Sequence, residues 1–141
     1  MFVDASAIVA ILKGEPEADD LIGRLEASDG AALISPVVRY EAAVSLAVSL
    51  ARGRGEAKAG GADFDTAEAL VTAFLKEIGA EEVPVTDRIG SGAIRAARRY
   101  GKVSGHRADL NMGDCFAYAC AEAHGVGSLY KGRDFAETEI G

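Results

Sequence analysis

The first fourteen residues, MFVDASAIVAILKG (1–14), decide how this chain is expected to fold. The apolar run 1–3 ends at the acidic Asp4, and Ser6 is placed to cap a helix that continues to Lys13. The order is therefore strand, turn and helix. It places Asp4 at the carboxyl end of a short buried strand.

Short apolar runs and helical stretches alternate along the rest of the chain. The apolar runs predict further buried strands at 31–34, 82–85 and 126–130, and a marginal fifth strand at 138–140. Helices are expected at 16–27, 36–52, 87–100 and 111–124, and another begins at Asp63 or Asp65 and ends before Gly79. Because helices separate the strands throughout, we expect a doubly wound α/β domain: a three-layer α/β/α sandwich with a parallel sheet of four to five strands.

Apolar side chains at helical spacing indicate which helix faces should be buried. In the helix 36–52, Val37, Val44 and Val48 form a stripe that should meet the sheet. In the helix that ends before Gly79, the residues expected to face inward are Ala69, Phe74, Leu75 and Ile78.

Composition narrows the class of protein. With 141 residues, 49% of them hydrophobic, the chain is expected to form one domain over 1–141. The longest uncharged run, 42–51, is far shorter than the roughly 20 apolar residues of a membrane span. No basic segment precedes the first apolar run, so we expect no secretory signal and a cytoplasmic protein.

Charge and cysteine content exclude further classes. A net charge of −7 argues against general coating of nucleic acid and against an anionic membrane partner, although a local site can still bind a nucleic-acid substrate. Cys115 and Cys120 diverge by about 140° on the expected helix, so they cannot form a disulfide with each other. With only His106 and His124 besides, a structural zinc site is not expected.

Two acidic residues follow expected strands. Asp4 comes directly after the first strand, and Asp134 comes a few residues after the strand 126–130. In a doubly wound sheet, the carboxyl ends of the strands form the functional crevice. Both side chains are therefore candidates for that crevice, although helix capping or turn formation would explain either residue taken alone.

Two more acidic residues lie on apolar helix faces. Glu41 falls on the valine stripe of the helix 36–52, and Asp114 shares a face with Ala117, Tyr118 and Ala121. A buried carboxylate without a partner costs several kcal/mol, so each needs a cation or a proton. The simplest alternative is a salt bridge, for example from Glu41 to Arg39 or Lys131.

These four acids, Asp4, Glu41, Asp114 and Asp134, could converge at one end of the sheet. Carboxylates gathered in one pocket repel one another unless a divalent cation is present. A set of oxygen ligands without His or Cys favours Mg²⁺ or Mn²⁺ over zinc.

Four segments in register resemble one known family. The opening MFVDASAIVAILKGEPEADDLI, the YEA of 40–42, the NMGDCFAYACA of 111–121 and the YKGRDFAETEI of 130–140 resemble PIN-domain ribonucleases of the VapC toxin type. The resemblance spans nearly the whole chain. It implies that Asp4, Glu41, Asp114 and Asp134 are the catalytic, metal-binding acids and that Ser6 supports Asp4.

The resemblance also implies an activity and partners. Members hydrolyse RNA phosphodiester bonds with one or two Mg²⁺ ions, for which Mn²⁺ substitutes, and they act as toxins of toxin–antitoxin pairs. The expected partners are RNA, a VapB-like antitoxin and a second copy of the chain, in a homodimer and in a heterotetramer or larger complex with the antitoxin. Arg133, where the family has a small polar residue, and the loop 53–61 depart from the pattern.

Lys131 and Arg133 come shortly before Asp134 in the sequence, so we expect their side chains to contact RNA phosphates.

Two other functions fit the sequence less well. A phosphotransfer receiver would need an acceptor Asp at the end of the third strand, where this chain has Val85, Thr86 and Asp87. A non-catalytic module that only holds a partner would be favoured by loss of one of the four acids, and all four are present.

Overall fold

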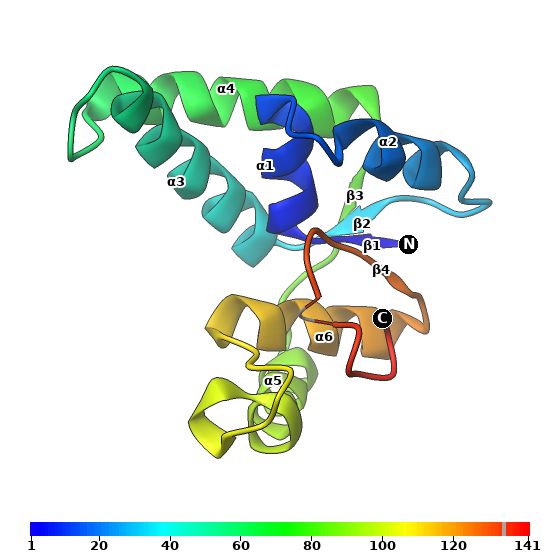
Figure 1. The fold of residues 1–141 in the computed structure, drawn as a ribbon. Helices are drawn as coiled ribbons and strands as arrows, with labels where there is room; N and C mark the ends of the chain where they lie inside the picture. The colour runs from blue at the N-terminus through cyan, green and yellow to red at the C-terminus, as the bar shows by residue number, and fades with distance from the viewer. Residues whose placement is uncertain (134) are drawn as a thin grey trace.

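A computed structural model describes residues 1–133 and 135–141. In these residues, four short strands form one parallel sheet (Figure 1). The strands are β1 (Phe2–Val3), β2 (Leu33–Ile34), β3 (Glu81–Glu82) and β4 (Ser128–Leu129). Their order is β3-β2-β1-β4, so the chain builds outward on one side of β1 and then crosses to its other side.

Helices cover both faces of this sheet. They are α1 (Ala5–Lys13), α2 (Ala18–Glu26), α3 (Pro36–Gly53), α4 (Gly61–Glu77), α5 (Asp87–Tyr100) and α6 (Met112–His124), with a 3₁₀ turn η1 (Lys102–Ser104) after α5. Figure 1 shows α1 to α4 on one side of the sheet and α5 with α6 on the other. The expected three-layer α/β/α architecture is confirmed.

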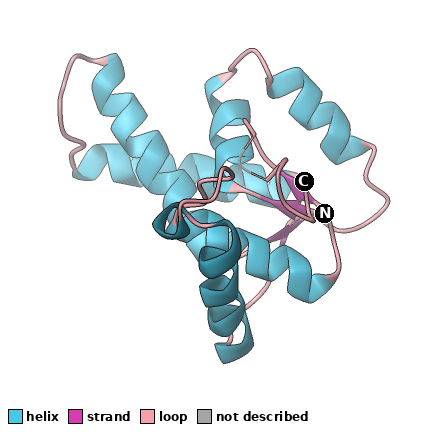
Figure 2. Cartoon of the chain, turned by 60° about the horizontal axis from the view of Figure 1, so that its bottom comes forward, coloured by secondary structure: helices cyan, strands magenta, loops and turns pink. Residues whose placement is uncertain are grey.

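Burial of the strands follows from this cover. Phe2 and Val3 in the central strand β1, and Leu129 in the edge strand β4, are fully buried, as expected for a parallel sheet between helical layers. On β3, at the opposite edge, Glu81 and Glu82 are exposed. Figure 2 shows the small sheet surrounded by helices. In the described part of the chain, no helix is long and apolar enough to cross a membrane.

The predicted fifth strand does not form. Residues 138–140 adopt turns and bends, in which the Thr138 hydroxyl donates to the Phe135 carbonyl at 2.7 Å. A backbone hydrogen bond from Ser128 N to Ile140 O, at 3.2 Å, ties this segment to β4. The hydrogen bond from the Thr138 hydroxyl to the Phe135 carbonyl stabilises a turn and so competes with the extended conformation of a strand.

The buried face of α3 differs from the predicted valine stripe. Val37, Val44 and Val48 are only partly buried, whereas the buried residues of this helix are Val38, Ala42, Leu46, Ala47 and Ala51. Small alanine side chains allow α3 to pack closely on its neighbours. The valine side of the helix, which includes Glu41, therefore does not pack against the sheet as expected.

The start of α4 also differs from the expectation. Its N-cap is Gly60 rather than Asp63 or Asp65. Asp63 lies in the first turn, where its Oδ2 accepts from the Gly60 backbone N–H at 2.8 Å and its two oxygens accept from Arg54 at 2.7 and 3.0 Å. This ion pair closes the connection between α3 and α4.

The inward face of α4 was predicted in part. Leu75 is buried as expected, together with Ala67 and Val71, but Ala69 is exposed. Phe74 and Ile78 are partly buried against the core.

Candidate active site

Asp4 directly follows β1, the strand at which the order of the sheet switches from β2 and β3 on one side to β4 on the other. Its backbone N–H donates to the Leu129 carbonyl at 2.9 Å, so it continues the pairing of β1 with β4. Ligand sites in doubly wound sheets form at such a switch point, at the carboxyl ends of the strands. Only 5% of Asp4 is exposed.

The Asp4 side chain is the N-cap of α1. Its Oδ2 accepts from the backbone N–H of Ser6 at 2.9 Å and from the Ser6 hydroxyl at 2.6 Å. The Ser6 oxygen in turn accepts from the Lys131 backbone N–H at 3.0 Å. Asp4, and not Ser6 as the sequence suggested, therefore caps the helix. Ser6 orients the Asp4 carboxylate and is itself held by the backbone of the segment that follows β4.

Asp114 is the third residue of α6 and takes part in its capping box. Its Oδ2 accepts from the Asn111 backbone N–H at 2.8 Å, and its own N–H donates to Asn111 Oδ1 at 3.0 Å. An acid at this position also interacts favourably with the helix dipole. The carboxylate is thus fixed at the start of α6.

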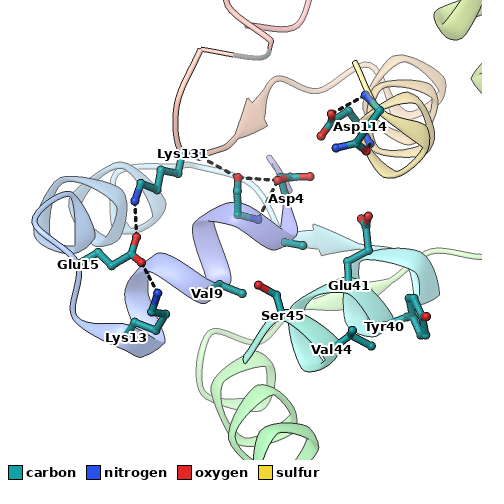
Figure 3. Close-up of a pocket in the computed structure, with 13 residues that line it drawn as sticks. Asp4, Val9, Lys13, Glu15, Tyr40, Glu41, Val44, Ser45, Asp114 and Lys131 are labelled. Atoms are coloured by element: carbon teal, nitrogen blue, oxygen red, sulfur yellow. Dashed lines mark hydrogen bonds and ion pairs between the residues drawn. The ribbon is translucent and has the colours of Figure 1, made fainter. Parts of the chain in front are cut away.

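Glu41 rises from the first half of α3 toward the space between Asp4 and Asp114 (Figure 3). Burial raises the pKa of Glu41 to about 7, and the negative charges of Asp4 and Asp114 add to this increase. The alternative of a salt bridge to Arg39 or Lys131 is not observed among the described residues, because Arg39 Nε binds Glu82 at 2.7 Å and Lys131 pairs with Glu15. Glu41 therefore lies among acids.

Asp63 is a buried acid with a structural role and serves as a comparison for the acids of the cavity. It is as buried as Asp4, but the Arg54 guanidinium and the Gly60 N–H hold the pKa of Asp63 below its usual range. The pKa of Glu41 changes in the opposite direction, because Glu41 is partly buried and lies close to the negative charges of Asp4 and Asp114.

The three acids line one open cavity of about 590 Å³. They come from the end of β1, from α3 and from the start of α6, which are far apart in the sequence. Figure 3 shows their side chains around the same space. The convergence predicted for Asp4, Glu41 and Asp114 is therefore observed.

Lys131 also lines this cavity, but Arg133 is not among the described lining residues and is exposed. The Lys131 ammonium pairs with Glu15, and more loosely with Glu17 at 3.7 Å. The hydrogen bond from Lys13, followed by that from Lys131, lowers the pKa of Glu15. Asp134 lies outside the described residues.

Several lining residues were missed from the sequence. Lys13 and Glu15, joined at 2.8 Å, form one wall, and Tyr40 and Ser45 lie on α3. Asn111 could have been found, because Asn followed three residues later by an acid is a capping-box pattern. The other four give no local signal.

Comparisons with known proteins identify the family. Residues 1–141 match the PIN domain family. A VapC ribonuclease of Rhizobium meliloti (strain 1021) is 45% identical over 144 residues, which cover 99% of each chain. This chain belongs to the PIN-domain family of VapC proteins.

Other VapC proteins agree with this assignment. Ribonuclease VapC42 of Mycobacterium tuberculosis (strain ATCC 25618 / H37Rv) is 36% identical over 140 residues, covering 99% of this chain and 96% of the relative. The crystal structure of Mycobacterium tuberculosis VapC20, described as a sarcin–ricin loop cleaving toxin, superposes with a TM-score of 0.68 over 99% of this chain and 95% of VapC20. At 18% identity, VapC20 confirms the VapC fold.

The donor chemistry of this VapC cavity suits a hard divalent cation. Carboxylate oxygens are the ligands that Mg²⁺ and Mn²⁺ prefer, and a cation would offset the repulsion that adds to the effect of burial on the pKa of Glu41. Within residues 1–133 and 135–141, no group of three such ligands is already arranged to hold a metal ion. Asp4, Glu41 and Asp114 are three of the four acids predicted for the site.

Proposed function

We propose that this protein is a metal-dependent endoribonuclease that hydrolyses RNA phosphodiester bonds and acts as the toxin of a toxin–antitoxin pair. One observation carries the proposal. Three carboxylates from separate elements line one cavity, in which burial, together with the negative charges of Asp4 and Asp114, raises the pKa of Glu41 to about 7. The VapC ribonucleases to which the chain is similar support RNA as the substrate.

The catalytic metal site consists of Asp4, Glu41, Asp114 and Asp134, with Mg²⁺ as the cofactor and Mn²⁺ as its substitute. A bound divalent cation lowers the pKa of a water molecule and offsets the negative charge that develops on the phosphodiester oxygens. Ser6 holds Asp4 in orientation through the 2.6 Å hydrogen bond. Either Asp114 or Asp134 orients the attacking water as a general base.

Lys131 and Arg133 contact phosphates of the RNA. Lys131 lies on the cavity wall, where Glu15 occupies its ammonium group. A phosphate oxygen is a comparable acceptor for this ammonium, so RNA binding would exchange one anionic partner for another. Arg133 is exposed two residues further along the chain.

Protein partners complete the proposed function. We expect one domain over 1–141, a VapB-like antitoxin, a homodimer and cytoplasmic action. Ile94, Val103 and Met112 are 73%, 91% and 71% exposed and line one apolar surface pocket, and a contiguous apolar patch of this kind supports contacts with other protein chains. Light scattering of the purified protein, alone and with any short protein encoded directly upstream of its gene, measures these assemblies.

Cleavage of RNA by the antitoxin-free protein tests the proposal. The parent should cleave RNA when Mg²⁺ or Mn²⁺ is present and should not cleave it in the presence of a chelator. The Asp4→Asn variant should not cleave RNA with either metal. Asp65→Asn is the matched control, since Asp65 is an exposed acid on α4 outside the cavity lining. Undiminished cleavage by Asp4→Asn would contradict the proposal, and tight antitoxin binding without any cleavage by the parent would favour a non-catalytic module.

A further inference from the structure

Gly113 lies directly against the carboxyl group of Glu41. A Cβ atom added at position 113 would overlap the Glu41 carboxyl carbon and both carboxyl oxygens, and these are the three nearest atoms that it would meet. Gly113 is buried, and it is the second residue of α6, immediately before Asp114. The chain reaches this contact from α3 and from α6, which are more than 70 positions apart in the sequence.

The local backbone gives no reason for glycine at this position. Gly113 is helical, unlike Gly14 and Gly125, which end α1 and α6 with φ values of 62° and 65°. Within a helix, glycine is less favourable than alanine, because it loses more backbone freedom on folding. The feature of this site that requires glycine is therefore the space taken by the Glu41 carboxyl group.

We propose that Gly113 is a positioning residue, whose missing side chain lets the Glu41 carboxylate lie beside Asp114 and face the cavity shared with Asp4. The inference rests on the proposed metal site and adds a residue to it that does not itself touch the cation. Because Glu41 is the flexible partner in the contact, alanine at 113 would displace its carboxyl group rather than the helix. The effect should therefore fall on ion binding and not on folding.

The expected displacement can be seen without any metal. Atoms in ordinary van der Waals contact lie about 3.5–4.0 Å apart, so in Gly113→Ala the Glu41 carboxyl group must move away until this separation is reached. A crystal structure of Gly113→Ala in chelator should show Glu41 in another rotamer, with α6 and the capping box of Asp114 unchanged. An unmoved Glu41 carboxylate, with α6 shifted instead, would overturn the proposal.

Binding of Mn²⁺, measured by electron paramagnetic resonance, tests the consequence in a four-protein cycle. The proteins are the parent, Gly113→Ala, Glu41→Ala and the double variant. Gly113→Ala should weaken Mn²⁺ binding by about 10–100-fold, the range for loss of a group that orients a ligand. In the Glu41→Ala background, the same substitution should change the affinity less than about twofold, because no carboxylate remains to be displaced.

Gly23→Ala is the matched control, because Gly23 lies within α2 and an added Cβ there meets nothing within 4 Å. Its Mn²⁺ affinity should equal that of the parent. Melting temperatures of both Gly→Ala variants should equal or exceed the parent value. If Gly113→Ala fails to fold while the double variant folds, the contact serves folding and the positioning role is wrong.

The outcomes separate this inference from the proposed function. Weaker Mn²⁺ binding in Glu41→Ala with parent-like binding in Gly113→Ala would overturn the role of Gly113 and leave the metal site standing. An equal loss from Gly113→Ala in both backgrounds would also overturn it, since the substitution would then act without Glu41. Parent-like binding by Glu41→Ala would refute the assignment of Glu41 itself, and with it the reason for Gly113.

Discussion

The Ser6 hydroxyl donates to Asp4 Oδ2 at 2.6 Å. The same hydroxyl oxygen accepts from the Lys131 backbone N–H at 3.0 Å. One side chain thus joins the acid at the end of β1 to the segment that follows β4. The relationship suggests that Ser6 affects ion binding as well as stability.

Replacing Ser6 with alanine should therefore have two effects. Loss of these hydrogen bonds should destabilise the fold by about 1–3 kcal/mol, because the Lys131 N–H loses its acceptor. Loss of the orienting hydroxyl should weaken Mn²⁺ binding by about 10–100-fold. Chemical denaturation and calorimetric titration measure the two effects.

Ser35→Ala is the control for that prediction. Ser35 is the N-cap of α3, and its hydroxyl oxygen accepts from the Val38 N–H at 3.3 Å, but it does not line the cavity. Its loss should destabilise the protein by about 1 kcal/mol and leave Mn²⁺ affinity unchanged. Equal ion affinities in Ser6→Ala and the parent would assign Ser6 to structure alone.

The raised pKa of Glu41 predicts a pH-dependent stability in the absence of metal. Because its pKa is about 7 in the folded protein and 4.5 as the ordinary value, the folded state binds a proton more tightly. The stabilisation of the folded state by the proton on Glu41 is complete below about pH 4.5 and is lost as pH rises through 7. After allowance for solvent screening, we expect a decrease of about 1–3 kcal/mol between pH 5 and 8.

Glu41→Gln tests this directly, since the neutral amide cannot titrate. In chelator, the free energy of unfolding of the variant should change less between pH 5 and 8 than that of the parent, and the variant should be the more stable protein at pH 8. Asp65→Asn should follow the parent curve. A Glu41→Gln variant with the parent's pH dependence would show that another group carries the change.

Binding of Mn²⁺ should release a proton from Glu41. At pH 6.5, below its pKa of about 7, this carboxyl group is mostly protonated, but a ligating carboxylate must be ionised. Calorimetry in two buffers of different ionisation enthalpy should detect this proton in the parent and not at pH 9. Buffer-independent heats at pH 6.5 would contradict the assignment of Glu41 as a ligand.

The ion pair between Lys131 and Glu15 predicts opposite effects of two charge changes on RNA binding. Lys131→Gln should weaken binding and reduce the salt dependence by about 0.7–0.9 in slope, the effect of one lost phosphate contact. Glu15→Gln should strengthen binding, because the ammonium group loses a competing carboxylate. Lys76→Gln, an exposed change of the same charge on α4, serves as the control. An unchanged slope in Lys131→Gln would make this lysine a structural residue.

The periodicity of apolar residues and the alternation of strands with helices were sufficient to predict much of the fold. The alternation of strands and helices gave the three layers, and the positions of Asp4, Glu41 and Asp114 indicated their convergence before any contact was known. The prediction for the buried face of α3 was wrong. It followed the valines because they are the larger apolar residues, whereas close packing buries the small Ala42, Ala47 and Ala51.

Contacts between distant segments could not be predicted from the sequence. The pairing of Lys131 with Glu15 depends on how the chain after β4 meets the end of α1, and no local pattern specifies that distance. The same holds for Gly113, which reads as an ordinary helical glycine until Glu41 is placed against it. For the same reason, the sequence alone could not decide between a metal site and a salt bridge for Glu41.

Calorimetric titration of the antitoxin-free protein with Mn²⁺ tests the central claim most directly, because it needs no RNA substrate. The parent and Asp65→Asn should bind Mn²⁺ with the same affinity, and Asp4→Asn should show no binding at the same concentrations. Equal binding by Asp4→Asn and the parent would show that the acids of this cavity are not the metal site.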